Sequence, residues 1–322
     1  MGLLMGQPGF GVGYNKPWGP IGQYNLIADV RLEIGGPCPA IFREEYMAIA
    51  TAIRAAGERF RVVNPGVGDT EVRALCDSPV YVNPAIKGVL RMYPRDMVAD
   101  IGPCILINGH YFEGCLELDG KLFMSSPFGE GGVLLSRGGV GVTSYYFGPD
   151  WEAWSDPERE DLGREAGLNI AVVSACYTRE CESYFSDPHI DRVASLVEGV
   201  DGGMHLLLDP QYVGYDYKER LPTEPIDVVK RSCEPLEIEV HTPKRMMLPY
   251  SVSVLQLPNG NVVMTSGDEV MYDLVCEIVG EDRVFLTPVP IRAYPAYAYA
   301  GIHCLVTEYP DSLGDFPVGV LQ

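Results

Sequence analysis

Short apolar runs separated by turn residues predict a chain made mainly of short strands. Tyr24–Val30 forms such a run, and residues 61–63 form another that ends at the turn residues Asn64-Pro65-Gly66. Between them, residues 43–60 predict a helix. Its apolar side chains follow helical spacing, at Tyr46, Met47, Ile49, Ala50 and Ile53.

The same order of elements is clearest near the C-terminus. Two apolar runs flank the turn Pro258-Asn259-Gly260, which predicts a hairpin, and a helix follows with Ser266 or Asp268 as its N-cap. The predicted elements are strands at 252–257 and 261–264, a helix at 268–279 and a closing strand at 283–287.

Similar strand–turn–strand pieces recur along the chain, at 98–107, at 133–142 around Arg137-Gly138-Gly139, and at 204–213 around Asp209-Pro210. A spacing of about 45 to 65 residues predicts a repeated α/β module arranged around an axis. An ordinary α/β sandwich is the alternative. No linker-like block divides the sequence, so residues 1–322 are expected to form one domain.

Composition narrows the class of protein. The chain has 322 residues, of which 47% are hydrophobic and 21% charged, as expected for a globular protein with a large core. No apolar run approaches the roughly 18 residues of a membrane helix, and the N-terminus lacks the features of a signal peptide. No membrane partner is therefore expected.

The nine cysteines are odd in number and irregularly spaced, without a Cys-x-x-Cys pair. This pattern predicts reduced, mostly buried thiols in a cytoplasmic protein, with neither a metal nor a cofactor. The net charge of −20 argues against a nucleic-acid partner, because phosphate binding needs clustered basic residues. It favours either simple solubility or a small cationic substrate.

Four short segments carry candidate chemistry: a charged pair, a glycine-flanked glutamate, a His-x-Asp motif and a His-Cys pair. They are Arg95-Asp96, Glu130-Gly131-Gly132, His189-Ile190-Asp191 and Ile302-His303-Cys304. A thiol nucleophile, a histidine that moves protons and carboxylates that hold a cation are together the groups needed for covalent catalysis at an electron-poor carbon.

In this order the four segments resemble those of the guanidino-group-modifying enzymes, the pentein superfamily. Its members include arginine and agmatine deiminases, dimethylargininases and amidinotransferases. The resemblance covers residues 93–308. It implies a five-bladed α/β-propeller of pseudo-repeated strand–helix units around a central pocket, in agreement with the repeats noted above.

The resemblance also implies roles for single residues. Cys304 would be the nucleophile, and His189 the general acid/base. Asp96 and Asp191 would hold the guanidinium nitrogens by charge-assisted hydrogen bonds, with Arg95 beside them in the substrate site. Glu130 would be the third carboxylate, oriented toward His189 or the substrate.

Some assignments stay open. Val133 follows Glu130-Gly131-Gly132 where many deiminases have aspartate, so Glu113 is an alternative to Glu130. His241 is an alternative base to His189. His303 is expected to be structural, because neighbouring side chains in a strand face opposite sides.

The substrate is also open. The loop before Cys304 has one glycine, Gly301, where relatives have more. A substrate with an α-carboxylate would need an arginine, and none of the four candidates is favoured: Arg137, Arg179, Arg192 and Arg292.

The leading hypothesis is a hydrolase of the guanidino group of arginine or an arginine-like molecule, giving either a ureido product or an amine. The alternatives are an amidinotransferase that passes the group to an acceptor amine and, less favoured, a pentein that binds without turnover. A homo-oligomer is compatible with each.

Overall fold

The computed structural model describes about half of the chain, in separate ranges. These are residues 2–5, 40–63, 70–75, 79–80, 95, 98–100, 104–108, 115–118, 121–126, 134–144, 163–164, 167–173, 190–210, 215–216, 221–222, 225–295 and 300–309. The predicted strand at 24–30 lies outside these residues.

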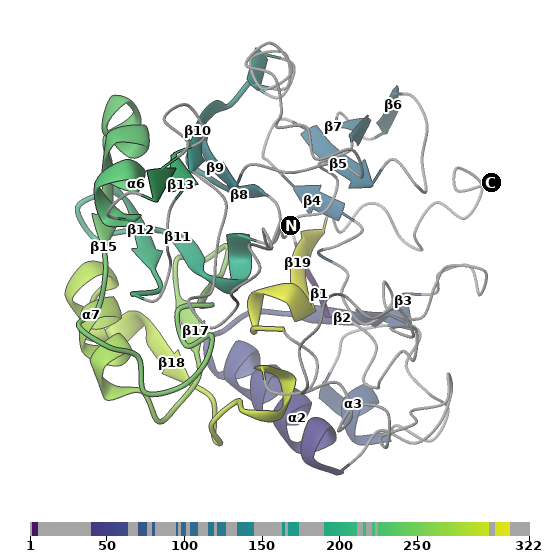
Figure 1. Cartoon of the computed structure of the whole chain (residues 1–322). Helices are drawn as coiled ribbons and strands as arrows, with labels where there is room; N and C mark the ends of the chain where they lie inside the picture. The colour runs from purple at the N-terminus through teal and green to yellow at the C-terminus, as the bar shows by residue number, and fades with distance from the viewer. Residues whose placement is uncertain are drawn as a thin grey trace, which may run out of the picture.

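Five small sheets share one topology within the described residues (Figure 1). In each, a strand pairs antiparallel with the next one, which in turn pairs parallel with a third. Connections of this kind require a crossover before the parallel strand. The sequence prediction of a repeated α/β module is therefore confirmed as a repeat of topology.

Two of the sheets have four strands. The first has the order β19-β1-β2-β3, with β1 (Gly2–Met5) paired to the C-terminal strand. Its other strands are β2 (Phe60–Val63), β3 (Pro79–Val80) and β19 (Val306–Tyr309). The second has the order β4-β5-β7-β6. Its strands are β4 (Val98–Asp100), β5 (Cys104–Asn108), β6 (Cys115–Leu118) and β7 (Lys121–Ser126).

Three further sheets have three strands each. One contains β8 (Leu134–Arg137), β9 (Val140–Ser144) and β10 (Asn169–Val173). The next contains β11 (Ala194–Glu198), β12 (Met204–Leu208) and β15 (Ile238–His241). The last contains β16 (Leu255–Gln256), β17 (Val262–Met264) and β18 (Val284–Leu286). A two-stranded ribbon is formed by β13 (Tyr215–Asp216) and β14 (Leu221–Pro222).

Figure 1 shows these sheets following one another around the molecule in chain order. Neighbouring sheets contact each other through β19 and β4 and through β8 and β11. Helix α2 (Ala40–Ala55) contacts β17 and β18 of the last sheet. The N- and C-terminal strands β1 and β19 pair directly, so the two ends of the described chain meet in one sheet.

Helices pack against the sheets through their apolar faces. In α2, the side chains of Phe42, Tyr46, Ile49 and Ile53 recur every three or four residues and are buried in one hydrophobic cluster. The other helices are α3 (Thr70–Leu75), α6 (Pro225–Cys233) and α7 (Glu269–Val279). Figure 1 places α6 and α7 at the periphery, where they contact β15 and β18.

The N-terminus of α7 is fixed by a buried carboxylate, and Asp268 rather than Ser266 is the N-cap. Its Oδ1 accepts a hydrogen bond from the N–H of Met271, while Oδ2 accepts from the backbone of Met247 and Leu248 and from Ser251 Oγ. The predicted helix at 268–279 is thus confirmed. The cap also ties the helix to the segment before β16.

Other element predictions shift in position. The predicted helix at 43–60 begins earlier and ends at Ala55, because Phe60 is already part of β2. The pieces at 98–107 and 133–142 are confirmed as the hairpins β4–β5 and β8–β9. Residues 211–213 of the predicted hairpin at 204–213 lie outside the described residues. Strand β12 does not form that hairpin, because it pairs antiparallel with β11 through a turn at residues 199–203 and parallel with β15, which leaves neither edge free.

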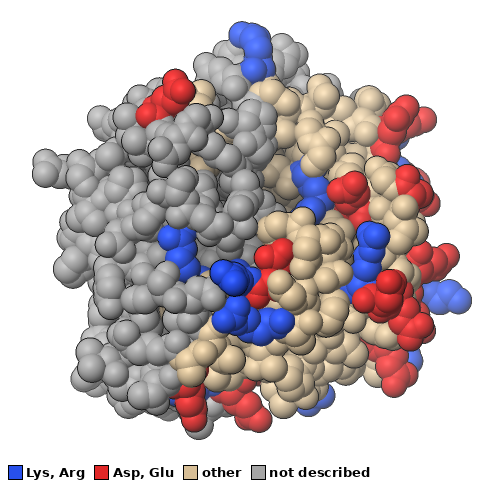
Figure 2. Space-filling model, turned by 180° about the vertical axis from the view of Figure 1, so that it is seen from behind, with Lys and Arg blue, Asp and Glu red and all other residues tan. Residues whose placement is uncertain are grey.

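Charge is mixed on the face drawn in Figure 2. Acidic side chains lie mainly along the edge of its described part, and basic side chains gather nearer the middle. The described part of this face therefore shows no single acidic patch. Among the described residues, no helix is long and apolar enough to cross a membrane.

Candidate functional site

Cys304 lies in a single turn of 3-10 helix, η6 (His303–Leu305), directly before strand β19. Its side chain is buried, with 4% exposed. The preceding Gly301 approaches Ser253 so closely that an added Cβ would meet Ser253 Oγ at 2.1 Å, and the N–H of His303 donates to that oxygen at 3.3 Å. Glycine thus allows the close packing that places the turn.

Asp191 lies in a second short 3-10 helix, η2 (Ile190–Arg192), just before strand β11. It is fully buried. The thiol of Cys304 donates a hydrogen bond to Asp191 Oδ2 at 3.2 Å, which joins two segments far apart in the sequence.

Arg95 balances the buried charge of Asp191. Its Nε lies 3.9 Å from Asp191 Oδ2, and its guanidinium donates to the carbonyl of Leu134 at 3.3 Å. A buried carboxylate without a cation would be costly, so this pair helps to keep Asp191 ionised. Cys304, Asp191 and Arg95, three of the six predicted site residues, therefore meet at one point.

His303 belongs to the same cluster. Its Nδ1 lies 3.8 Å from Asp191 Oδ2. The expectation that it faces away from Cys304 assumed a strand, and that assumption is wrong because both residues lie in η6. A turn of 3-10 helix allows adjacent side chains to approach a common partner, whereas a strand points them to opposite faces.

Burial, and to a smaller extent the nearby cation of Arg95, lower the pKa of His303 from 6.5 to about 4, while Asp191 opposes both effects. The imidazole is therefore neutral at physiological pH. In the cluster, the negative charge of Asp191 is matched by Arg95 and not by His303.

Acid should destabilise the protein partly through His303. In the unfolded chain its pKa returns to the ordinary value of about 6.5. Between pH 6.5 and about 4 the unfolded state binds a proton at His303 that the folded state does not. The free energy of unfolding is therefore not reduced by His303 above pH 6.5, and it decreases as the pH falls toward 4. Urea unfolding over this range should show a shallower pH dependence for His303→Gln, by up to about 1.4 kcal/mol per pH unit. Identical slopes for the two proteins would contradict the burial of a neutral His303.

A small pocket opens beside this cluster. The described residues that line it lie on strands β8, β11 and β16, with Arg95 from before β4 and His303 from before β19. They are Arg95, Leu135, Ser136, Arg137, Leu196, Leu255, Gln256 and His303. Arg137 donates to the carbonyl of Gln256 at 2.7 Å, which fixes its guanidinium at the wall. The pocket thus combines apolar side chains with fixed positive charge, a lining suited to a small polar molecule.

The other predicted residues have different outcomes. Asp96, Glu130 and His189 lie outside the described residues, as do the alternatives Glu113 and Arg179. Arg192 donates to Tyr250 Oη and stacks on its ring, with Cζ 5.1 Å from the ring centroid. Arg292 is exposed. Of the arginines considered for a substrate carboxylate, Arg137 is the one among the described residues that lines the pocket.

His241, the alternative base, belongs to a different cluster. Its Nε2 lies 3.0 Å from Nδ1 of His205, and Glu239 is next to both. No sequence motif indicates this group. Its signal is weak, because His205 and His241 stand in separate apolar runs and only the pairing of β12 with β15 brings them together.

The fold is shared with solved structures of an agmatine deiminase and an arginine dihydrolase. Agmatine deiminase of C. jejuni matches with a TM-score of 0.55 at 12% identity, over 95% of this chain and 92% of that one. The N-terminal domain of ArgZ, an arginine dihydrolase of cyanobacteria, matches with a TM-score of 0.52 at 9% identity, over 95% and 98% of the two chains.

These matches confirm the resemblance that the sequence motifs indicated, and at such identities they establish the fold. Comparison with protein-family models gave no match, and neither did the search of curated sequences. The α/β class is confirmed. Closure of the five sheets into a propeller, and the roles of the site residues, remain predictions.

Proposed function

We propose that this chain is a hydrolase of guanidino groups that works through a covalent adduct on Cys304. The observation that carries the proposal is the hydrogen bond from the Cys304 thiol to the fully buried Asp191 carboxylate, at 3.2 Å. A buried carboxylate is a good partner for a guanidinium, and here it lies within reach of a thiol nucleophile. The structural neighbours, an agmatine deiminase and an arginine dihydrolase, support this choice.

In the free protein the carboxylate accepts a hydrogen bond from the thiol, and a thiolate so close to it would face a like charge. A bound guanidinium would replace the thiol as the hydrogen-bond donor to Asp191 and would also offset the repulsion between the carboxylate and a thiolate. It takes over the carboxylate by charge-assisted hydrogen bonds, and its positive charge favours the thiolate beside it. Substrate binding would therefore activate the nucleophile, which protects Cys304 from side reactions when the site is empty.

The proposed chemical step combines the Cys304 and Asp191 pair with His189 in the role of general acid/base that the motif resemblance implies. The thiol passes its proton to His189, and sulfur bonds to the guanidinium carbon to give a tetrahedral adduct. The C–N bond breaks as His189 returns the proton to the departing nitrogen, which leaves a thiouronium on Cys304. Water, deprotonated by His189, attacks the same carbon, and cleavage of the C–S bond restores the thiol.

The remaining carboxylates complete the proposed site. Asp96 is next to Arg95 in the sequence, and Arg95 Nε lies 3.9 Å from Asp191 Oδ2. We assign Asp96 to a second guanidinium nitrogen and Glu130 to the orientation of His189 or of the substrate. Residues 1–322 would form one domain in which the five sheets close into a propeller, with each sheet supplying part of the pocket.

We assign Arg137 to bind the α-carboxylate of the substrate, at the end away from the guanidino group. It lines the pocket beside His303, and its guanidinium is held by the carbonyl of Gln256. A fixed guanidinium pairs well with a carboxylate. The proposed substrate class is therefore an arginine-like α-amino acid, rather than its decarboxylated analogue.

A product assay tests this function. Purified protein is incubated with arginine, agmatine and N-methylated arginines, each with and without glycine as an acceptor amine, and ammonia, ureido products and released amines are measured. We expect turnover without the acceptor, and higher kcat/KM for arginine than for agmatine. Lysine, which lacks the guanidino group, is the matched control. Turnover that strictly requires glycine would make the chain an amidinotransferase, and the absence of any product would overturn the proposal.

A further inference from the structure

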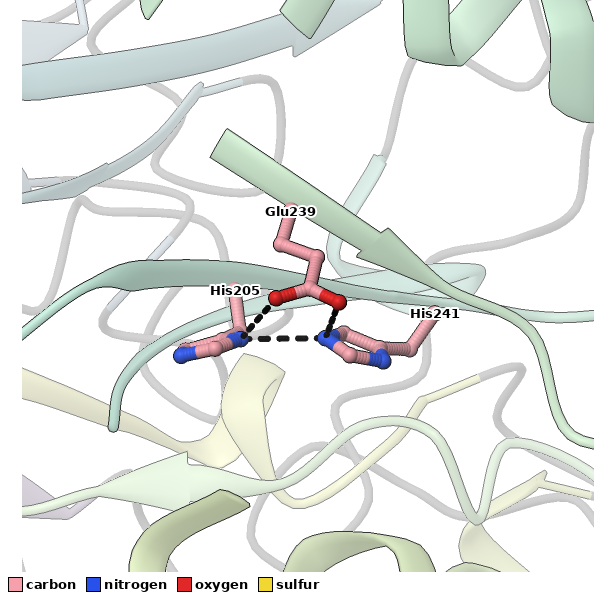
Figure 3. Close-up of side chains that lie close together, drawn as sticks. All are labelled: His205, Glu239 and His241. Carbon is pink, nitrogen blue, oxygen red and sulfur yellow. Dashed lines mark hydrogen bonds and ion pairs between the residues drawn. The ribbon is translucent and has the colours of Figure 1, made fainter. Parts of the chain in front are cut away.

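Three ionisable side chains converge on one face of the β11–β12–β15 sheet (Figure 3). His205 is on β12, and its parallel partner on β15 is Glu239. His241 is two residues further along β15, and residues two apart in a strand share a face. The opposite face, with Leu206, Ile238 and Val240, is buried in the cluster that contains α6 residues.

The three side chains are spaced as ligands of one small ion. His205 Nδ1 lies 3.0 Å from His241 Nε2, and each of these nitrogens lies 3.7 Å from an oxygen of Glu239. For Zn²⁺ with bonds of about 2.0–2.1 Å, tetrahedral geometry puts neighbouring ligand atoms about 3.3 Å apart. The observed distances bracket this value, so coordination requires only a few tenths of an ångström of movement.

A fourth residue sets the orientation of the His205 ring. Nε2 of His205 lies 3.3 Å from Asp201 Oδ1, and the backbone N–H of Gly203 holds that carboxylate oxygen at 2.9 Å. A carboxylate beside Nε2 keeps the proton on that nitrogen, which leaves the lone pair of Nδ1 directed at the cluster. This arrangement of carboxylate, histidine and open lone pair is typical of metal-binding histidines.

The cluster also has more acceptors than protons. The lone pair of His205 Nδ1 and the Glu239 carboxylate both face His241 Nε2, which carries at most one proton. That proton can satisfy one of the two acceptors. A divalent cation at the centre would satisfy all three groups at once.

The cluster is buried at His205 and open to solvent at Glu239. His205 is 7% exposed, and its ring fills the space beside Gly199, where an added Cβ would lie 2.5 Å from Nε2. His241 is partly buried and Glu239 is exposed. Two fixed imidazoles and one accessible carboxylate leave a fourth position for water.

We propose that His205, Glu239 and His241 bind a divalent transition-metal ion, with Asp201 as a positioning residue for His205. Imidazole and carboxylate ligands without thiolate suit Zn²⁺ and its neighbours Co²⁺ and Ni²⁺. The ion would join β12 to β15 on the face opposite α6. This site shares no residue with the Cys304 cluster and does not depend on the proposed hydrolase activity.

The test uses the full chain, freed of any affinity tag and treated with chelator. Zn²⁺ binding is measured by calorimetry, and Co²⁺ binding by absorption, which reports whether thiolates are ligands. We expect one equivalent of Zn²⁺, a higher Tm with the ion, and a Co²⁺ spectrum without the sulfur charge-transfer band. Cys304→Ser should bind the ion as the native protein does.

Three variants locate the ion. His241→Ala should weaken Zn²⁺ binding at least about 100-fold, while Glu239→Gln and Asp201→Asn should each weaken it about 10- to 100-fold. Glu239 and Asp201 are exposed, so those two variants should fold and have the native Tm in chelator. Glu234→Gln, the same change at another exposed glutamate, is the matched control and should leave binding unchanged. No stoichiometric binding, unchanged affinity in His241→Ala, or loss of binding in Cys304→Ser would overturn the proposal.

Discussion

Replacement of Cys304 by serine is expected to reduce guanidino turnover by at least about 10³-fold, as is typical for the loss of a catalytic nucleophile. Serine keeps a hydrogen-bond donor toward Asp191 and nearly the same volume, so the site should remain assembled. What is lost is the thiolate, because an alcohol is far harder to ionise than a thiol. Steady-state assays with the best compound of the substrate panel measure the effect on kcat/KM.

The matched control is Cys276→Ser. Cys276 is a partly exposed thiol on α7, outside the cluster around Asp191, and its replacement should leave kcat/KM within about twofold of the native value. Substrate binding to Cys304→Ser, followed by calorimetry, should persist. Turnover by Cys304→Ser at a native rate would remove the cysteine from the mechanism.

Replacement of Asp191 by asparagine is the second large effect, and we expect kcat/KM to fall about 10²- to 10³-fold. The amide has the shape of the carboxylate but lacks its charge. It cannot form charge-assisted hydrogen bonds with a guanidinium, and it leaves Arg95 without its buried counter-ion. Both KM and kcat should worsen, because the carboxylate holds the substrate and also fixes its carbon against the sulfur.

Asp273→Asn tests whether the loss of any one negative charge would reduce kcat/KM. It makes the same chemical change at an exposed position on α7, and activity should be unaffected. Circular dichroism and thermal unfolding of Asp191→Asn separate a folding defect from a catalytic one. An Asp191→Asn protein that is folded and within threefold of native activity would show that this carboxylate does not bind the substrate.

Much of the fold could be predicted from local sequence. Turn residues such as Pro258-Asn259-Gly260 and Arg137-Gly138-Gly139 mark hairpins wherever they flank apolar runs, and both hairpins are present. The hairpin placed around Asp209-Pro210 was wrong because strand β12 has two candidate turns, and Asp201-Gly202-Gly203 forms the actual one. Turn residues in the sequence do not predict which neighbouring strand a given strand pairs with.

The site was harder to predict than the fold. Distant motifs pointed to Cys304, Asp191 and Arg95, and these three do meet. The position of His303 could not be predicted, since one turn of 3-10 helix has no periodicity to recognise.

The His205 cluster was missed for a different reason. Its members lie on two strands, and the parallel register that pairs His205 with Glu239 is set by tertiary packing, not by either strand alone. His241 was considered as a base, but only the pairing of the strands shows that its neighbours are another histidine and a carboxylate.

The central claim is a covalent adduct on Cys304, and mass spectrometry tests it most directly. Residues 293–322 contain no Lys or Arg, so trypsin cleavage after Arg292 releases Cys304 within this peptide, where it is the only cysteine. Native protein is mixed with its best guanidino substrate, quenched in acid at short times and digested. We predict that this peptide gains the mass of the thiouronium group during turnover and returns to its native mass when the substrate is consumed. An unmodified peptide at every time point during measured turnover, or an adduct on another cysteine, would contradict the mechanism.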